Sequence, residues 1–267
     1  MKVICLKGGL GNQLFEYCRY RQLMEEGRER IFLYHDHRRL KQHGGLLISD
    51  CFKVSLPSSP WWVSLLVGGV KLLRRLGIFA RLYDDERADC LLIDDYCQSR
   101  QYISDAVRYL DFQEFDLSVA NQGILSMIAE SSYPVAVHVR RGDYLHQVNL
   151  SSFGLCPVSY YQRAIRYIRE KHPDARLFFF SDDMEWVTAH LQTDNAVYVR
   201  QAEGEPDYID LYLMTRCRGH IIANSTFSFW GARLSSFQGI NVYPRRWYRH
   251  PQWQAPDIFP DDWVSCE

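Results

Sequence analysis

The residues with the clearest chemical potential in this 267-residue chain form the run His138-Val139-Arg140-Arg141-Gly142-Asp143. The run Val135-Ala136-Val137-His138-Val139, with little polar interruption, predicts a strand covered on both faces. Side chains alternate along a strand, so His138 and Arg140 point to the same side at its carboxyl end. Because the planar guanidinium of an arginine donates two parallel hydrogen bonds to a phosphate, the run predicts a phosphate-binding site. An ion pair between Asp143 and either arginine is the structural alternative.

Two further polar clusters follow apolar runs that we predict to be strands. Ser181-Asp182-Asp183 comes after residues 177–180, and Asn224-Ser225-Thr226 comes after residues 220–223. The first cluster offers either a helix cap, from its serine or its first aspartate, or a carboxylate that accepts two N–H bonds from a guanine edge. The second predicts an anion site, because hydroxyls and backbone N–H groups gather where a helix begins; simple capping is its alternative.

A glycine-rich turn lies near the N-terminus. The run Gly8-Gly9-Leu10-Gly11-Asn12 links a predicted strand, residues 3–6, to a predicted helix that ends at about Gly27. Glycines let a backbone approach a ligand closely. The run lacks the Lys-Ser/Thr of a P-loop and the third glycine of a dinucleotide-binding fingerprint. A tight turn without a ligand is the alternative, but the amides of Asn12 and Gln13 favour binding.

Short apolar strands and helical patterns alternate along the chain, which is typical of parallel sheets with crossover helices. The alternation occurs in two sets, separated by an irregular segment near residues 115–130. We therefore predict an α/β protein of two Rossmann-like halves, residues 1–125 and 126–267, whose parallel sheets face a central cleft. Ligands bind at the carboxyl ends of the strands in such sheets, where all the polar clusters stand.

The composition is that of an ordinary globular protein, with 47% hydrophobic and 24% charged residues. Lys and Arg (31) nearly balance Asp and Glu (32), which argues against a nucleic-acid partner. The eight cysteines include no Cys-x-x-Cys pair and fit reduced thiols in the cytosol. The run His35-Asp36-His37 lacks a third ligand at a suitable spacing, so we expect no bound metal.

No stretch reaches the roughly 20 apolar residues that a membrane span needs. Residues 61–70 are apolar and aromatic, and Lys71, Arg74 and Arg75 follow them. This pattern predicts either an interfacial helix or a buried helix with a basic end. We expect a cytoplasmic protein that is at most peripheral at the inner membrane.

Three runs resemble the signature segments of the bacterial α-1,2-fucosyltransferases of glycosyltransferase family 11. They are Gly8-Gly9-Leu10-Gly11-Asn12-Gln13-Leu14-Phe15, His138-Val139-Arg140-Arg141-Gly142-Asp143-Tyr144 and Ala223-Asn224-Ser225-Thr226-Phe227-Ser228-Phe229-Trp230-Gly231-Ala232. They occur in the family's order and span nearly the whole chain. Two departures concern the acceptor preference: Glu16 stands where the family commonly has Gln, and Phe229-Trp230-Gly231-Ala232-Arg233 stands for Trp-Trp-Gly-Ala-Trp.

The resemblance implies a GT-B fold, with a GDP-fucose site in the C-terminal half and the acceptor side in the N-terminal half. It implies inverting transfer of L-fucose from GDP-β-L-fucose to the 2-hydroxyl of a terminal galactose, as in O-antigen or capsule synthesis. GDP-fucose is a co-substrate, the oligosaccharide acceptor is free or lipid-linked, and no metal or other cofactor is expected. The alternatives are another GDP-sugar transferase of this fold, a protein O-fucosyltransferase, and a non-catalytic nucleotide- or glycan-binding protein.

The resemblance also assigns donor-binding roles. Arg140 is expected to contact the donor phosphates, and Asp182 to lie near the guanine. The expected donor-binding residues are Gly11, His138, Arg140, Asp182, Asn224, Ser225, Thr226 and Ser228, of which Ser225, Thr226 or Ser228 would lie near the pyrophosphate.

Three residues are expected to serve the reaction directly. Arg140 supplies positive charge to the departing GDP, and Asn12 holds the fucose or the acceptor. Asp143 is one candidate for taking the proton of the acceptor hydroxyl. Glu16 and Asp95 are further candidates, and the departing phosphate can itself take the proton.

Overall fold

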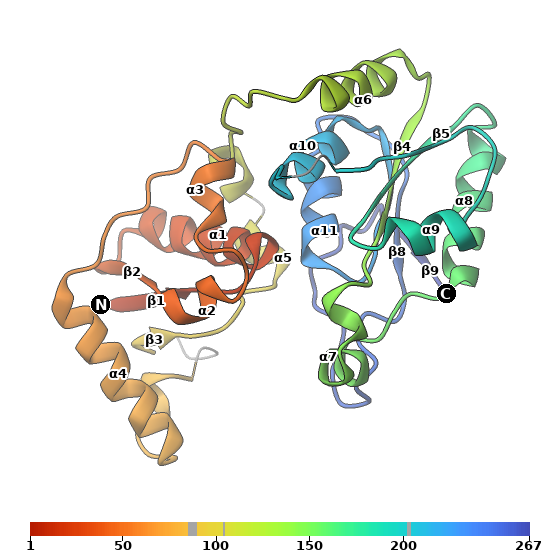
Figure 1. Ribbon diagram of the computed structural model, residues 1–267. Helices are drawn as coiled ribbons and strands as arrows, with labels where there is room; N and C mark the ends of the chain where they lie inside the picture. The colour runs from red at the N-terminus through yellow and green to blue at the C-terminus, as the bar shows by residue number, and fades with distance from the viewer. Residues whose placement is uncertain (85–89, 104, 202–203) are drawn as a thin grey trace. The chain divides into compact units, whose positions relative to one another are not determined.

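The computed structural model describes residues 1–84, 90–103, 105–201 and 204–267, and these divide into two compact units. The first unit is Met1–Glu114 and the second is Phe115–Glu267 (Figure 1). The boundary that the sequence suggested, between residues 125 and 126, falls inside helix α6 (Val119–Glu130), which packs on α10 (Tyr208–Arg216) of the second unit.

The first unit has a three-stranded parallel sheet in the order β2-β1-β3. Its strands are β1 (Lys2–Leu6), β2 (Ile31–His35) and β3 (Leu92–Ile93). Its helices are α1 (Leu10–Glu26), α2 (His37–Lys41), α3 (Leu47–Cys51), α4 (Trp61–Arg75) and α5 (Arg100–Ile103), with short 3-10 turns at Ala80–Leu82 and Ala106–Tyr109.

All five residues of β1 are buried, and their side chains alternate between the two faces of the sheet, as a sheet between two helical layers requires. Val3 and Cys5 pack in one cluster with the inner face of α4. The intervening residue Ile4 points to the opposite face, where α1 packs on the strand. Helix α1 ends as predicted, at Gly27, whose positive φ of 61° is the left-handed conformation that suits glycine.

The second unit has a six-stranded parallel sheet in the order β6-β5-β4-β7-β8-β9. Its strands are β4 (Pro134–Val139), β5 (Arg176–Ser181), β6 (Ala196–Tyr198), β7 (Gly219–Ile221), β8 (Asn241–Pro244) and β9 (Val264–Cys266). Its helices, besides α6 and α10, are α7 (Gln147–Ser152), α8 (Val158–Lys171), α9 (Met184–His190) and α11 (Thr226–Arg233), with a 3-10 turn at Asp143–Leu145.

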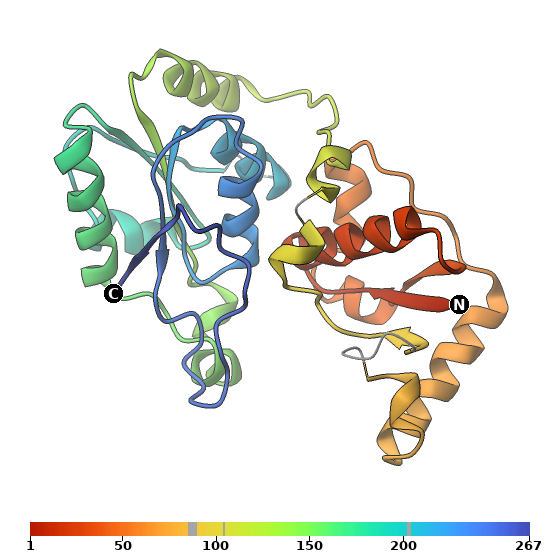
Figure 2. The same cartoon turned by 180° about the vertical axis from the view of Figure 1, so that it is seen from behind.

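The central strand β4 is buried along its whole length, as the apolar run predicted. Val135 and Val137 pack with α8 and α9, while α10 and α11 lie over the other face of the sheet (Figures 1 and 2). His138 points to this second face, and its ring centroid lies 5.7 Å from that of Phe227 in α11. The sheet therefore carries its polar residues to the carboxyl edge between α11 and the loops after β4 and β5.

The sequence suggested that the segment near residues 115–130 is irregular. The structure instead places helix α6 in it. Ser118 begins this helix, and its hydroxyl accepts a hydrogen bond from the N–H of Asn121. Such a cap stabilises a helix start whose apolar periodicity is weak.

Candidate active site

The carboxyl edge of the six-stranded sheet brings together residues from three separate segments. Strand β4 lies between β5 and β7, and all three run parallel. Arg140 follows β4, Asp182 follows β5, and Asn224 lies three residues beyond the end of β7. The residues predicted for donor binding in the C-terminal half therefore share one edge, which is where ligands bind in open parallel sheets.

Arg140 lies between two carboxylates at this edge. Its Nη2 is 2.7 Å from Oδ1 of Asp143, and its Nη1 is 3.0 Å from Oδ2 of Asp182. The guanidinium carbon also lies 5.7 Å from the ring centroid of Tyr144. The ion pair proposed as the structural alternative is thus present, but the arginine side chain keeps 31% exposure. These contacts orient the guanidinium group of Arg140 and leave part of it accessible to a ligand.

The neighbouring Arg141 is held in a different way. Its Nε donates to Oδ2 of Asp183 at 2.9 Å, and its guanidinium stacks 3.9 Å from the ring centroid of Trp186. Asp183 also accepts the N–H of Trp186 and so caps α9. The cap considered as the alternative role of Ser181 or Asp182 is therefore made by the next residue. Burial raises the pKa of Asp183, but the Arg141 bond and the cap outweigh it and hold that pKa below its usual value. Arg141 is a structural residue of this loop.

Asp182 uses both carboxylate oxygens within the protein. Oδ1 accepts the backbone N–H of Arg141 at 2.8 Å, while Oδ2 pairs with Arg140. Gly142 permits this arrangement, because a Cβ on it would lie 2.7 Å from Oδ2 of Asp182. The residue between the second arginine and Asp143 therefore has to be a glycine for the two loops to meet.

His138 lies near the end of β4, two residues before Arg140, and is buried. Burial, together with the adjacent Arg140 charge, lowers the pKa of His138 to about 4 against the opposing effect of Asp182. The ring is therefore neutral at pH 7. Its Nδ1 has no hydrogen-bond partner among the residues that the structure describes. His138 thus offers a hydrogen-bonding nitrogen, and the positive charge at this edge comes from Arg140.

The Asn224 side chain ties loops together. Its Nδ2 lies 3.1 Å from the carbonyl oxygen of Phe153, 3.3 Å from that of Gly154 and 3.1 Å from that of Trp247. The main-chain carbonyl oxygen of Asn224 accepts a hydrogen bond from the Tyr144 hydroxyl at 3.1 Å. Asn224 therefore positions the loops at this edge through contacts made within the protein.

The hydroxyls after Asn224 divide into two kinds. Ser228 is buried and donates back to the carbonyl oxygen of Ser225 at 3.1 Å, so it stabilises the first turn of α11. Ser225 is the N-cap residue and makes no side-chain capping bond, and Thr226 next to it is partly exposed. Together with the N–H groups that a helix start leaves unpaired, Ser225 and Thr226 can receive an anion.

The glycine turn lies at the corresponding edge of the first sheet. Gly8 has a φ of 72°, and α1 begins directly after Gly9, which places Gly11 in the first helical turn. Oδ1 of Asn12 accepts a bond from Gln98 at 3.0 Å. Gln13 is fully buried and bonds the carbonyl oxygen of Gly8 within the protein, so its amide is structural. Gly11 and Asn12 belong to the first unit, and the Asn12 bond to Gln98 is made within that unit.

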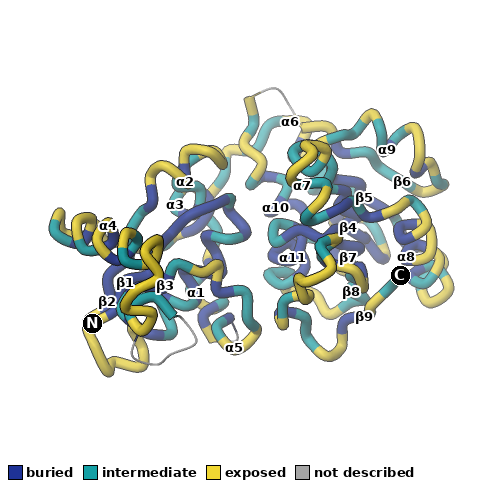
Figure 3. The backbone as a smooth tube through the Cα atoms, turned by 90° about the horizontal axis from the view of Figure 1, so that it is seen from below, coloured by how far each residue is buried: buried dark blue, intermediate teal, exposed yellow. Residues whose placement is uncertain are grey.

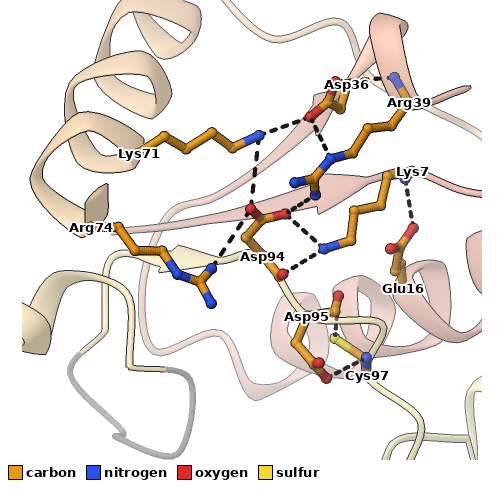
Figure 4. Close-up of polar contacts among 9 residues, drawn as sticks. All are labelled: Lys7, Glu16, Asp36, Arg39, Lys71, Arg74, Asp94, Asp95 and Cys97. Atoms are coloured by element: carbon orange, nitrogen blue, oxygen red, sulfur yellow. Dashed lines mark hydrogen bonds and ion pairs between the residues drawn. The ribbon is translucent and has the colours of Figure 1, made fainter. Parts of the chain in front are cut away.

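A charged cluster that the sequence analysis missed occupies this same edge (Figure 4). Lys7 follows β1, Asp36 follows β2 and Asp94 follows β3, so one polar residue stands after each strand. Nζ of Lys7 is 2.7 Å from Oδ1 of Asp94, and Nη1 of Arg39 is 3.0 Å from the same oxygen. Nζ of Lys71, from α4, is 2.8 Å from Oδ2 of Asp36. The sequence signal that could have identified this cluster is that Lys7, Asp36 and Asp94 each directly follow a strand.

Glu16 and Asp95, the remoter candidates for the proton acceptor, lie beside this cluster. Asp95 accepts the N–H of Cys97 at 2.7 Å. Glu16 accepts the N–H of Lys7 at 2.8 Å and is completely buried. Burial raises the pKa of Glu16 well above its usual value, against the opposing effects of that hydrogen bond and of the Lys7 charge. Among the described residues, no group of three or more His, Cys, Asp or Glu side chains is placed to hold a metal ion.

The raised pKa of Glu16 makes stability depend on pH. The folded protein holds this proton more tightly than the unfolded chain does, so stability is full below pH 4.5 and falls as the pH rises toward the folded-state pKa. Because glutamine does not ionise, Glu16→Gln is expected to remove up to about 1.4 kcal/mol of this loss per pH unit. Denaturant unfolding from pH 5 to pH 8 measures the effect. Glu26→Gln, at the exposed end of the same helix, is the control, and parallel pH profiles for the two variants would contradict the burial argument.

Comparison with known proteins gives a family and a fold. A model described as "Glycosyl transferase family 11" matches residues 97–267. An alpha-1,2-colitosyltransferase of Escherichia coli is 28% identical over 98% of this chain and 97% of its own length. The O-antigen biosynthesis glycosyltransferase WbnK of Escherichia coli is 29% identical over 98% of this chain and 99% of its own. A galactoside 2-alpha-L-fucosyltransferase of Caenorhabditis elegans is 30% identical over 62% of this chain and 49% of its own.

The fold is similar to that of a solved fucosyltransferase. The crystal structure of NodZ alpha-1,6-fucosyltransferase soaked with GDP-fucose matches with a TM-score of 0.52 and 15% identity, over 88% of this chain and 92% of that chain. This likeness confirms the predicted GT-B class of α/β fold with parallel sheets.

Proposed function

The chain belongs to glycosyltransferase family 11, and from that premise we propose that it transfers L-fucose from GDP-β-L-fucose to the 2-hydroxyl of a terminal galactose. The observation that carries the proposal is the position of Arg140, a partly exposed guanidinium aimed by Asp143 and Asp182 at the carboxyl edge of the second sheet. The O-antigen relative supports an oligosaccharide acceptor. The donor-soaked structure of similar fold supports GDP-fucose as the donor.

The proposed reaction is a single inverting displacement. The acceptor 2-hydroxyl attacks the anomeric carbon of fucose, and the bond from that carbon to the β-phosphate oxygen of GDP breaks. Arg140 receives the charge that develops on the departing diphosphate, and the N-terminus of α11 at Ser225 and Thr226 adds its dipole. His138, being neutral, contributes a hydrogen bond. Asp143 or the departing phosphate takes the acceptor proton, and we propose that no metal takes part.

A second candidate donor follows from the colitosyltransferase relative. Colitose is fucose without its 3-hydroxyl, so GDP-fucose and a GDP-linked colitose would differ only by that hydroxyl. A site that hydrogen-bonds a substrate hydroxyl rejects the analogue lacking it by up to roughly 10⁴–10⁵-fold, whereas a site without that bond accepts both. The two candidate activities can therefore be distinguished by comparing a donor that has the 3-hydroxyl with one that lacks it.

The test measures GDP release and product formation with GDP-fucose or GDP-colitose, in EDTA, with and without lactose or N-acetyllactosamine. Acceptor-stimulated release from GDP-fucose with a fucosylated product supports the proposal, including its independence of metal. A strong preference for GDP-colitose transfers the assignment to the second candidate. Activity that EDTA abolishes and a divalent ion restores contradicts the metal-free mechanism, and failure to bind either donor contradicts the whole proposal.

Asp182→Asn tests whether this residue reads the base. Hydrogen bonds to a charged group contribute about 1.5–3 kcal/mol, so loss of a guanine contact is expected to lower the preference for GDP over ADP and UDP at least about tenfold. Competitive inhibition by the three nucleotides measures it. Asp183→Asn, which changes the α9 cap and the partner of Arg141, is the matched control. An equal loss for all three nucleotides means that Asp182 acts through Arg140 and does not contact the base.

A further inference from the structure

Helix α4 is apolar on both of its sides. Val63, Val67 and Val70 are buried on the sheet of the first unit. The opposite side carries four large apolar side chains with high exposure: Trp61 (76%), Leu65 (68%), Leu72 (56%) and, just past the last turn, Leu76 (63%). At about 100° per residue, these four fall within a sector roughly 60° wide, so they form one stripe along the helix. Figure 3 shows the resulting alternation of buried and exposed residues along α4.

Two more exposed apolar side chains follow the helix in sequence. Ile78 is 43% exposed and Phe79 is 58% exposed. Phe79 has a φ of 55°, the left-handed conformation that large residues rarely adopt, and it leads into the 3-10 turn at Ala80–Leu82. We call Trp61, Leu65, Leu72, Leu76, Ile78 and Phe79 the apolar stripe.

The segment that carries the apolar stripe is basic up to residue 83, after which Asp84, Asp85 and Glu86 follow in the sequence. Residues 51–83 contain no Asp or Glu and five cations, Lys53, Lys71, Arg74, Arg75 and Arg81, although the chain as a whole has one more acid than base. Lys71 and Arg74 turn toward Asp36 and Asp94 at the sheet edge (Figure 4). Arg75 and Arg81 are exposed next to the apolar stripe.

We propose that the apolar stripe of α4 docks on an anionic phospholipid surface. An exposed Trp and leucines bordered by arginines suit the interface, where apolar side chains enter the acyl boundary and cations meet phosphate headgroups. The absence of acids from residues 51–83 complements a negatively charged surface rather than a mixed-charge protein surface. Among the described residues, no helix is long and apolar enough to cross a membrane, so α4 would lie in the plane of the interface.

The first test is co-sedimentation with vesicles, using the full chain. Vesicles of phosphatidylglycerol mixed with phosphatidylcholine are expected to bind the protein at least about tenfold better than phosphatidylcholine alone at low salt, and added salt is expected to reduce this advantage. The double variant Leu65→Gln/Leu72→Gln and the single variant Arg75→Glu are each expected to reduce binding about tenfold. Equal binding of the natural chain and these variants overturns the proposal.

Matched variants on other surfaces control for general effects. Val119 and Val148 are 87% and 77% exposed in the second unit, and Arg200 is exposed there. Val119→Gln/Val148→Gln and Arg200→Glu are expected to bind vesicles as the natural chain does. GDP binding serves as the check on folding in every variant, and it also keeps this test separate from the proposed reaction. Self-association that Leu65→Gln/Leu72→Gln disperses, without vesicle binding, would assign the stripe to a second copy of the chain and overturn the proposal.

Discussion

Replacing Arg140 with lysine is expected to lower the turnover of the sugar-nucleotide donor at least about tenfold, and replacing it with alanine to lower it roughly 10²–10³-fold. The expectation rests on geometry. Asp143 and Asp182 each pair with one Nη atom of Arg140, so the fork is fixed in one orientation before a ligand arrives. Lysine keeps the charge but is a point donor on a flexible stem, and it cannot satisfy both carboxylates and a diphosphate together.

The measurement is the steady-state rate of GDP release with a saturating acceptor. Arg141→Lys is the matched control, because Arg141 lies beside Arg140 in sequence but is bound to Asp183 and stacked on Trp186. We expect that control to change stability more than turnover. Unchanged kinetics for Arg140→Lys would remove the phosphate role, and equal losses for both arginine variants would mean that the loop, and not the Arg140 fork, controls the rate.

The carboxyl edge of the second sheet was predictable because its signals are local. The run from Val135 to Val139, apolar except for His138, predicts a strand covered on both faces, and side-chain alternation places His138 and Arg140 on the same side. The rule that ligands bind at the carboxyl ends of parallel strands then selects Asp182 and Ser225 without any knowledge of tertiary contacts. Local pattern and sheet geometry agree here, which is why the prediction of their common edge is confirmed.

The charged cluster of the first unit could not be predicted in the same way. Lys7 and Asp94 are 87 positions apart, and their pairing depends on β3 lying beside β1 in the sheet. The apolar residues near 91–93 indicate a short strand, but no local pattern encodes which strand is its neighbour. The hydrogen-bond partners of the Asn224 side chain could not be predicted from the sequence either. Its position after β7 indicated an anion site, but which main-chain carbonyls need a donor depends on how the loops at Phe153 and Trp247 fold back, and no periodic pattern encodes that.

Asn224→Asp is expected to be among the most destabilising single substitutions at this edge. Asparagine donates from Nδ2 to three main-chain carbonyl oxygens, and an ionised aspartate of the same shape accepts only. Leaving a buried polar group unsatisfied costs about 1–3 kcal/mol, and several such groups face a buried charge here. At about 2–4 °C per kcal/mol for a chain of this order of size, we expect the melting temperature to fall by roughly 10 °C.

Thermal unfolding and GDP binding together test the positioning role of Asn224. Asn149→Asp is the matched control, because it loses a single bond to the carbonyl oxygen of Asp143. The main-chain carbonyl oxygen of Asn224 accepts the Tyr144 hydroxyl, so the placement of this loop also sets the position of the Tyr144 ring beside Arg140. A positioning role therefore predicts that Asn224→Asp weakens GDP binding and loses stability in parallel, and that Asn224→Ala does so to a smaller extent. A stable Asn224→Asp protein that had lost only GDP affinity would instead place the Asn224 side chain in direct contact with the nucleotide.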